Sequence, residues 1–328
     1  MQHFRYTQGF KGRSVPLLIR IGSAIRAFFL IFTVIVDFPS IRGLRPSISS
    51  YSVTFLNDIT NLSHGKLLDF FGVLFRLVRI KDRKVFDVDA KRRRPLTTYD
   101  GSSVDFSLEK FSQVGFCRFE EFLGKTSADG LISQIQDLPG STDSSDWIYP
   151  TQKDWTLDLF SGPRFHTDRT ALESLPIVQT ICDSELVLQI ARSYLGCAPI
   201  LASVQSWTIR PPENATHDLL DHSAMAFHCD SDYFSFIKFF IMLNNVDMNN
   251  GPFTFVAYSH RGNRHVAGRM EDDEIVGPKD EVLYGTASAG DMVVCDTKGW
   301  HKAKPPISGS RTVLQLVFAS NLFGRTSK

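Results

Sequence analysis

Short apolar runs separated by turn residues dominate the C-terminal part of the chain. Residues 200–210 read ILASVQSWTIR, and residues 235–243 read SFIKFFIML, which is almost continuously apolar. Further strand-like runs lie at 253–259, 291–297 and 312–320. Several short strands with turns between them are typical of an all-β sandwich or barrel. We therefore predict a β-rich domain in this part of the chain.

Helical periodicity appears before the strands. The segment SELVLQIARSYLG, residues 184–196, repeats its apolar positions at helical spacing and ends on a glycine, a common helix stop. Residues 95–105 are rich in Thr, Ser and Gly and suit a linker. We therefore expect a helical N-terminal extension over 1–100 and a compact domain over 101–328, mainly β with flanking helices.

The N-terminal extension combines apolar and basic segments. Residues 27–36 (AFFLIFTVIV) are apolar, but a transmembrane helix needs roughly 20 such residues, and no signal-peptide cleavage pattern follows. A second segment, 66–80 (KLLDFFGVLFRLVRI), leads into basic clusters at 81–84 and 91–94. This pattern is typical of a helix lying on an anionic lipid surface. Two helices that pack on the core, with a solvated basic loop, are the alternative to membrane contact through 15–94.

The charge is unevenly distributed. The first hundred residues hold 17 Lys and Arg against 7 Asp and Glu, whereas the remainder holds 19 against 28. Such a charge distribution indicates that the basic region contacts an anionic partner. The candidates are the acidic part of the same chain, a lipid surface and a nucleic acid. Because no recognised nucleic-acid-binding module accompanies the charge, we expect no nucleic-acid partner.

The cysteine pattern indicates the compartment. The five cysteines are scattered and include no CxxC pair, which argues against a disulfide framework and for a reducing environment. We expect a cytoplasmic protein, with peripheral attachment to a membrane surface left open.

Two histidines, one aspartate and one arginine carry the candidate chemistry. His228 and Asp230 are two residues apart, so on a strand both side chains face the same way. His301 precedes the last long strand, and Arg311 begins it. Two imidazoles and one carboxylate suit an open non-haem iron(II) site, and a guanidinium grips a carboxylate bidentately. The set predicts an oxygenase that activates O2 with iron and 2-oxoglutarate.

Four further residues are candidate co-substrate contacts. Gln205, Ser206 and Thr208 lie on the strand before the first histidine, and we expect one of them to contact the co-substrate. Phe240 follows on the next strand and is a candidate wall of the 2-oxoglutarate pocket, with a plain core aromatic as the alternative.

Residues 106–324 resemble the phytanoyl-CoA dioxygenase family of iron(II)/2-oxoglutarate oxygenases. The matching stretches, in the family's order, are SELVLQIARSYLG, the strand ending TIRPP, FHCDSDYFSF, LNNVDMNNGPFTFVAYSHR and GWHKAKPPISGSR. The resemblance implies a double-stranded β-helix (jelly roll) with helices outside it. It assigns His228, Asp230 and His301 to iron and Arg311 to the distal carboxylate of 2-oxoglutarate. Residues 257–260 read AYSH where the family usually has Pro-Gly-Ser-His.

The sequence therefore predicts an Fe(II)/2-oxoglutarate-dependent dioxygenase. Hydroxylation of a small-molecule or lipid-linked substrate, with 2-oxoglutarate converted to succinate, is the expected reaction. Two other classes stay open: a non-catalytic binding or scaffold protein that keeps the fold, and a metal-dependent hydrolase that uses the same ligands.

Overall fold

The computed structural model describes most of the chain after residue 105. The described ranges are 96–97, 103–104, 106–142, 145–157, 162–212, 224–261, 272–275 and 281–320. The predicted extension over 1–100, including the membrane-contact segment 15–94, therefore lies outside the described residues apart from the strand Leu96–Thr97. Within the described ranges, no helix has the length and apolar character needed to cross a membrane.

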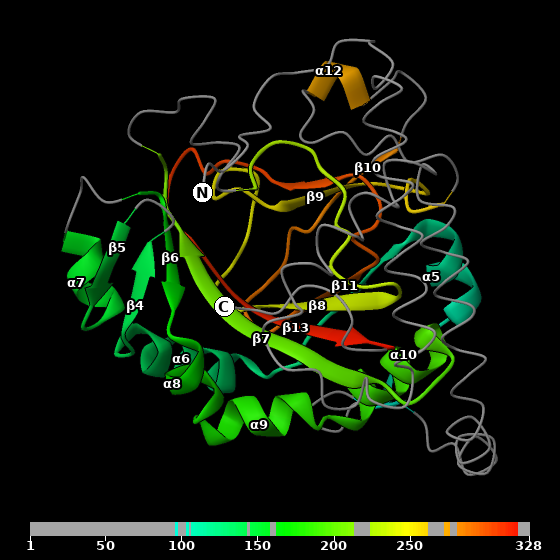
Figure 1. Cartoon of the computed structure of the whole chain (residues 1–328), viewed down its shortest axis with the longest axis horizontal. Helices are drawn as coiled ribbons and strands as arrows, with labels where there is room; N and C mark the ends of the chain where they lie inside the picture. Colours follow the sequence, from blue (N-terminus) through cyan, green and yellow to red (C-terminus); the bar gives the residue numbers. More distant parts are fainter. Residues whose placement is uncertain are drawn as a thin grey trace, which may run out of the picture.

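The larger of the two main sheets has eight strands in the order β3-β11-β8-β13-β7-β6-β4-β5, and all neighbours are antiparallel. Its longest members, β7 and β13, pair along most of their length (Figure 1). The strands are β3 (Phe116–Phe119), β4 (Gly140–Thr142), β5 (Ser145–Tyr149), β6 (Arg164–Thr167), β7 (Ile200–Ile209), β8 (Phe236–Met242), β11 (Met292–Cys295) and β13 (Arg311–Ala319).

The smaller main sheet is also antiparallel and has the order β10-β9-β12. Its strands are β9 (Phe253–Val256), β10 (Val282–Tyr284) and β12 (His301–Ala303). Two short strands, β1 (Leu96–Thr97) and β2 (Ser103–Val104), pair separately.

Helices cover the outer face of the large sheet. Figure 1 shows α6, α8, α9 and α10 along one side of the long strand β7, with β9 and β10 on the other side. The helices are α5 (Leu108–Val114), α6 (Lys125–Gln136), α7 (Gln152–Leu157), α8 (Arg169–Glu173), α9 (Pro176–Cys182), α10 (Glu185–Leu195) and α12 (Asp272–Ile275). The predicted helix at 184–196 is α10, which ends at Gly196 in the left-handed conformation, with φ 65°.

Strand alternation divides the large sheet into two faces with different partners. On β13, Leu314 and Leu316 join the cluster that packs against helix residues such as Leu186. Val313 lies on the opposite face and joins a second cluster with Phe255 of the small sheet. Both clusters are apolar and buried, so the large sheet is stabilised from both sides.

The arrangement is a jelly roll with an outer layer of helices. The predicted fold class, mainly β with flanking helices, is confirmed. Residues of β13 that share a face with Val313 point into the space between the two sheets, because alternate side chains on a strand point to the same side. On β13 these residues are Arg311, Gln315 and Val317.

Candidate metal and anion site

Backbone pairing brings the two candidate histidines together. His228 and His301 form an isolated antiparallel bridge, in which each backbone N–H donates to the other residue's carbonyl oxygen at 3.0 Å. Side chains of residues paired in this way project to the same side of the ladder. The two imidazole rings accordingly lie with their centroids 4.3 Å apart. Two residues more than seventy positions apart in the sequence thus supply two of the three candidate metal ligands.

Asp230 completes the cluster from the same strand segment as His228. Its backbone N–H donates to the carbonyl oxygen of Thr297 at 2.9 Å, which fixes the segment next to the loop before β12. Its Oδ2 lies 3.2 Å from Nε2 of His301, and its Oδ1 lies 3.7 Å from Nε2 of His228. One ligand atom from each residue falls within 4.8 Å of the others. The three side chains are therefore placed to hold one metal ion.

Two backbone carbonyls fix the tautomers of the histidines. Nδ1 of His228 lies 3.0 Å from the oxygen of Ala226, and Nδ1 of His301 lies 2.9 Å from the oxygen of Gly299. A carbonyl oxygen only accepts, so each Nδ1 carries the proton and donates it. Each Nε2 then keeps its lone pair for a metal, as outer hydrogen bonds commonly arrange for ligating histidines.

A buried lysine lies against the carboxylate of the cluster. Nζ of Lys238, on β8, is 2.7 Å from Oδ2 of Asp230 and 2.7 Å from Oδ2 of Asp232. Burial alone would raise the pKa of Asp230, but the adjacent Lys238 ammonium holds it well below its usual range. Burial likewise opposes the charge of Lys238, yet the two carboxylates raise its pKa above the ordinary lysine value. Both groups are therefore charged at neutral pH.

Arg311 is a buried cation on the inner face of the large sheet. It is 3% exposed, and neither its Nε nor its Nη1 has a hydrogen-bond partner within the described part of the chain. Burial, and then the nearby charge of Arg164, lowers the pKa of Arg311 to about 9. A buried guanidinium with unused donors is costly unless an anion satisfies it. Arg311 is therefore suited to a carboxylate ligand.

Gln205 and Phe240 lie on the same inner face as Arg311. In the strand registers, Gln315 of β13 is opposite both residues. Phe240 is 6% exposed and its ring centroid is 5.0 Å from that of Phe253, which in turn lies 5.5 Å from the ring of His301. Phe240 is therefore joined through Phe253 to the ring of His301, and its role as a wall of the 2-oxoglutarate pocket stays a prediction.

Ser206 and Thr208 do not meet the expectation that they could contact the co-substrate. They alternate with Gln205 and therefore face the outer side of the sheet, toward the helices. The Thr208 hydroxyl is 2.8 Å from the hydroxyl of Thr312, and Ser206 is paired with Leu314 of the outer cluster. Because side chains alternate along a strand, Ser206 and Thr208 lie on the opposite face of the sheet from Arg311.

Trp207 was missed by the sequence reasoning. It lies between Ser206 and Thr208 on the inner face, and no described residue accepts a hydrogen bond from its indole N–H. Its ring centroid lies 6.4 Å from that of Phe240 and 5.8 Å from the guanidinium carbon of Arg164. Trp207 follows Gln205 by two positions on β7, so both side chains point to the same face of the sheet. This spacing could have identified Trp207 from the sequence.

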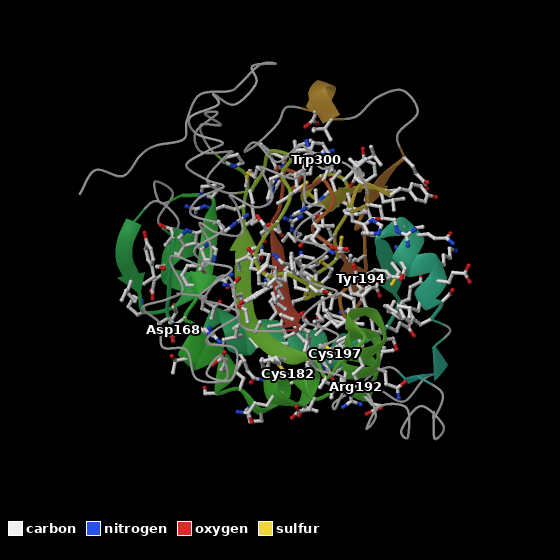
Figure 2. The ribbon with its side chains drawn as sticks, turned by 45° about the vertical axis from the view of Figure 1, so that its right-hand side comes forward. Asp168, Cys182, Arg192, Tyr194, Cys197 and Trp300 are labelled. Carbon is white, nitrogen blue, oxygen red and sulfur yellow. The ribbon has the colours of Figure 1, made fainter. Side chains whose placement is uncertain are left out.

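Trp300 marks the turn that leads into His301. Figure 2 shows Trp300, which directly precedes His301, on the opposite side of the ribbon from Cys182 of α9 and from Cys197. The backbone N–H of Trp300 donates to the Ser259 hydroxyl at 2.8 Å, which holds this turn in place.

A comparison with protein-family models gives one match. The model described as phytanoyl-CoA dioxygenase (PhyH) matches residues 111–313, which is well over half of the chain and includes all four candidate residues. The chain belongs to the phytanoyl-CoA dioxygenase family. Members of this family are iron(II)- and 2-oxoglutarate-dependent oxygenases, so the family predicted from the sequence is confirmed. No curated protein matches the chain at a significant level.

Several solved structures are similar to this phytanoyl-CoA dioxygenase family member at low identity. HygX from Streptomyces hygroscopicus, with nickel and 2-oxoglutarate bound, is 13% identical with a TM-score of 0.46, over 68% of this chain and 88% of that one. EctD from S. alaskensis, in its apoform, is 15% identical with a TM-score of 0.48, over 72% and 87%. EvdO2 from Micromonospora carbonacea var. aurantiaca, complexed with 2-oxoglutarate, is 17% identical with a TM-score of 0.44, over 66% and 91%.

Proposed function

We propose that this chain is a dioxygenase that hydroxylates a small-molecule or lipid-linked substrate, using Fe(II), 2-oxoglutarate and O2. One observation carries the proposal. His228, Asp230 and His301 form one cluster, and Arg311 is a buried guanidinium whose Nε and Nη1 have no hydrogen-bond partner among the described residues. The first three residues suit a divalent metal, and the fourth suits a carboxylate.

The donor set fits iron(II). His228 and His301 offer neutral Nε2 atoms, because each Nδ1 donates to a carbonyl oxygen. Asp230 offers a charged oxygen. Two imidazoles and one carboxylate on one side of an ion leave its remaining positions open for exogenous ligands. These residues would hold the metal and leave room for a bidentate co-substrate and O2.

Arg311 would hold the distal carboxylate of 2-oxoglutarate. Its Nε and Nη1 donors have no partner among the described residues, and a guanidinium can hold one carboxylate group through two parallel N–H donors. When bound, iron(II), 2-oxoglutarate and O2 supply the oxidation, in which 2-oxoglutarate is converted to succinate and CO2 and the substrate gains a hydroxyl group. The protein contributes the placement of these groups.

Apolar side chains would keep water out of this space. Phe240, Phe253 and Trp207 form a continuous aromatic series that reaches the ring of His301. A dry site strengthens the attraction between Arg311 and a bound carboxylate, because the local dielectric constant is low. Gln205 lies on the same face and offers a polar side chain beside this series.

The substrate proposal rests on the sequence of the N-terminal extension. Residues 15–94 alternate apolar and basic segments, a pattern that suits peripheral contact with an anionic membrane. We infer that the extension, 1–100, delivers the jelly-roll domain, 101–328, to a lipid surface. Co-sedimentation of the full chain with phosphatidylserine-containing vesicles tests this. Binding at low salt that is released at high salt is expected, and failure to sediment at low salt would favour a soluble metabolite.

Release of CO2 from 2-oxoglutarate tests the reaction class without a known substrate. Full-length protein is incubated with 2-oxoglutarate labelled at C1, with and without Fe(II), in air. Many enzymes of this kind turn over slowly without substrate, so we expect iron-dependent CO2 and succinate in equal amounts. His228→Ala should abolish both, and hydrolysis of ester or amide test compounds by a Zn(II)-loaded sample would instead support the hydrolase class.

A further inference from the structure

Trp207 carries a buried hydrogen-bond donor that the packing of its ring does not require. The indole packs against the inner apolar cluster that contains Val313, but its Nε1 is buried and no described residue accepts a hydrogen bond from it. A phenyl ring would pack in an apolar cluster without burying a donor. Because a buried N–H without an acceptor is costly, the indole indicates a ligand that supplies one.

Trp207 lies diagonally across the β7–β13 pair from Arg311. Val313 is opposite Trp207, Ile209 is opposite Arg311, and the register of the pair is regular from Arg311 to Val317. All of these residues lie within the two strands, so paired residues and residues two apart along a strand share a face of the sheet. Diagonal neighbours in an antiparallel pair are about 7–8 Å apart, which long and aromatic side chains can span. Trp207 and Arg311 can therefore reach one ligand.

Arg164 of β6 places the indole ring near the end of β13 that carries Arg311. Arg164 is opposite Ile209 and is thus in the same row across the sheet as Arg311. Its guanidinium carbon lies 5.8 Å from the centroid of the Trp207 ring, and its charge is felt at Arg311, where it adds to the effect of burial in lowering the pKa. Strands β6, β7 and β13 are neighbours in the large sheet (Figure 1). One indole and two guanidinium groups therefore gather over these three strands.

The gathered side chains offer donors and positive charge. An indole N–H and a guanidinium donate hydrogen bonds and do not accept them. Nε1 of Trp207, like Nε and Nη1 of Arg311, has no partner among the described residues. A carboxylate has about four acceptor positions on its two oxygens, so it can accept two parallel N–H donors from Arg311 and a further one from Trp207. This donor set therefore favours a carboxylate over a neutral group.

The aromatic series indicates which carboxylate this is. From the ring of His301, a candidate metal ligand, the series runs through Phe253 and Phe240 to Trp207, with centroid separations of 5.5, 5.0 and 6.4 Å. Trp207 is the last member of the series counted from His301. The keto-acid end of 2-oxoglutarate belongs at the metal, so the distal carboxylate is the end that belongs beside Trp207 and Arg311.

We infer that the indole N–H of Trp207 donates to the distal carboxylate of 2-oxoglutarate, beside the guanidinium of Arg311, and so helps to select a dicarboxylate co-substrate. This inference rests on the proposed function, because it concerns the co-substrate of the same reaction. Trp207 binds and orients the co-substrate and takes no part in the oxidation.

Two 2-oxo acids of equal carbon number separate the donor from the packing of the ring. 2-Oxopentanoate has a methyl group where 2-oxoglutarate has its distal carboxylate, and Trp207→Phe removes the N–H while keeping an aromatic ring. Isothermal titration calorimetry of the full-length, Mn(II)-loaded proteins measures both affinities. Trp207→Phe should bind 2-oxoglutarate roughly tenfold more weakly than wild type, as expected for loss of one hydrogen bond to a charged group, and 2-oxopentanoate within about twofold of wild type.

Nuclear magnetic resonance observes the indole N–H directly. The chain has four tryptophans, so protein with isotope-labelled tryptophan gives few indole resonances, and the one missing from Trp207→Phe belongs to Trp207. With Zn(II) as a diamagnetic metal, 2-oxoglutarate should move this proton resonance downfield, because the N–H gains a charged acceptor. 2-Oxopentanoate should not move it downfield, because it lacks the distal carboxylate.

Three results would overturn the inference: a Trp207→Phe protein that binds 2-oxoglutarate as tightly as wild type, equal losses for the two acids, and a Trp207 resonance that does not move at saturating 2-oxoglutarate. Equal losses would assign Trp207 to packing alone. If Trp207→Phe does not fold, substitution of the other tryptophans assigns the resonance, and the wild-type titration decides. A wild-type protein that does not bind 2-oxoglutarate is a different outcome, since it would contradict the proposed function itself.

Discussion

Asn244 accepts a hydrogen bond from Thr312, the residue that follows Arg311. The side-chain Oδ1 of Asn244 lies 2.7 Å from the backbone N–H of Thr312, and its Nδ2 donates to the carbonyl oxygen of Ser310 at 2.8 Å. The side-chain amide therefore bonds to the backbone on both sides of Arg311. It extends the β8–β13 ladder beyond Met242, the last residue of β8.

Loss of this amide should weaken 2-oxoglutarate binding more than metal binding. In Asn244→Ala the start of β13 loses two hydrogen bonds, so Arg311 is less well held. We expect roughly a tenfold weaker 2-oxoglutarate affinity, because a pair of hydrogen bonds contributes about 1–3 kcal/mol. Isothermal titration of the metal-loaded protein measures it. Asn245→Ala is the matched control, since the Asn245 Oδ1 accepts from the backbone N–H of Ala289, away from Arg311. An equal loss in both variants would contradict the account.

Replacement of Arg311 should separate stability from ligand binding. Among the described residues, Nε and Nη1 of this buried guanidinium have no hydrogen-bond partner, so Arg311→Met should stabilise the protein without 2-oxoglutarate by roughly 1–3 kcal/mol. The same change should abolish binding of 2-oxoglutarate. Thermal melting with and without 2-oxoglutarate checks both points: the ligand should raise the Tm of wild type only. A variant that is less stable and is still stabilised by 2-oxoglutarate would rule out this role.

The two faces of β7 should differ in their effect on co-substrate binding. Gln205 lies on the inner face, and Ser206 lies on the outer face beneath the helices. We expect Gln205→Ala to raise the KM for 2-oxoglutarate several-fold, whereas Ser206→Ala should leave it within twofold of wild type. Steady-state CO2 release as a function of 2-oxoglutarate concentration measures both. The reverse order of effects would mean that the strand register is wrong.

His260 should make the protein less stable in mild acid. Burial is the main cause that lowers its pKa, against the opposing charge of Asp296, while Lys298 and Arg261 add to the lowering. Its folded-state pKa is thus below its unfolded-state value near 6.5. Stability is fully present above about pH 6.5 and is lost as the pH falls toward the folded-state pKa, by at most about 1.4 kcal/mol per pH unit. Chemical denaturation at pH 7.5 and 5.5 should show a smaller difference for His260→Gln than for wild type.

Strand parity made much of the site predictable. His228 and Asp230 had to share a face once they were placed on an extended segment, and Arg311 had to share a face with Val313 on the last strand. The structure places all of them as expected, with Val313 between the sheets. The same rule would have excluded Ser206 and Thr208, had Gln205 been chosen as the inward residue.

Contacts that depend on tertiary structure could not be predicted. Lys238 occurs in a run of apolar residues, and only the packing of β8 against the ligand segment reveals that it reaches Asp230 and Asp232. The hydrogen bonds from the two histidines to the carbonyl oxygens of Ala226 and Gly299 could not be predicted either, because every residue type provides a backbone carbonyl. Asn244 reads as a turn residue, and its bonds to the backbone beside Arg311 depend on how β13 returns along β8.

An anaerobic titration with iron(II) and 2-oxoglutarate tests the central claim most directly. The measurement is the visible charge-transfer band of the chelate in wild type, His301→Ala and Arg311→Ala. The account predicts a band in wild type, no band in His301→Ala, and a band in Arg311→Ala only at much higher 2-oxoglutarate concentrations. The absence of a band in folded wild-type protein at any concentration would contradict it, and the four residues would then serve a different metal or a non-catalytic role.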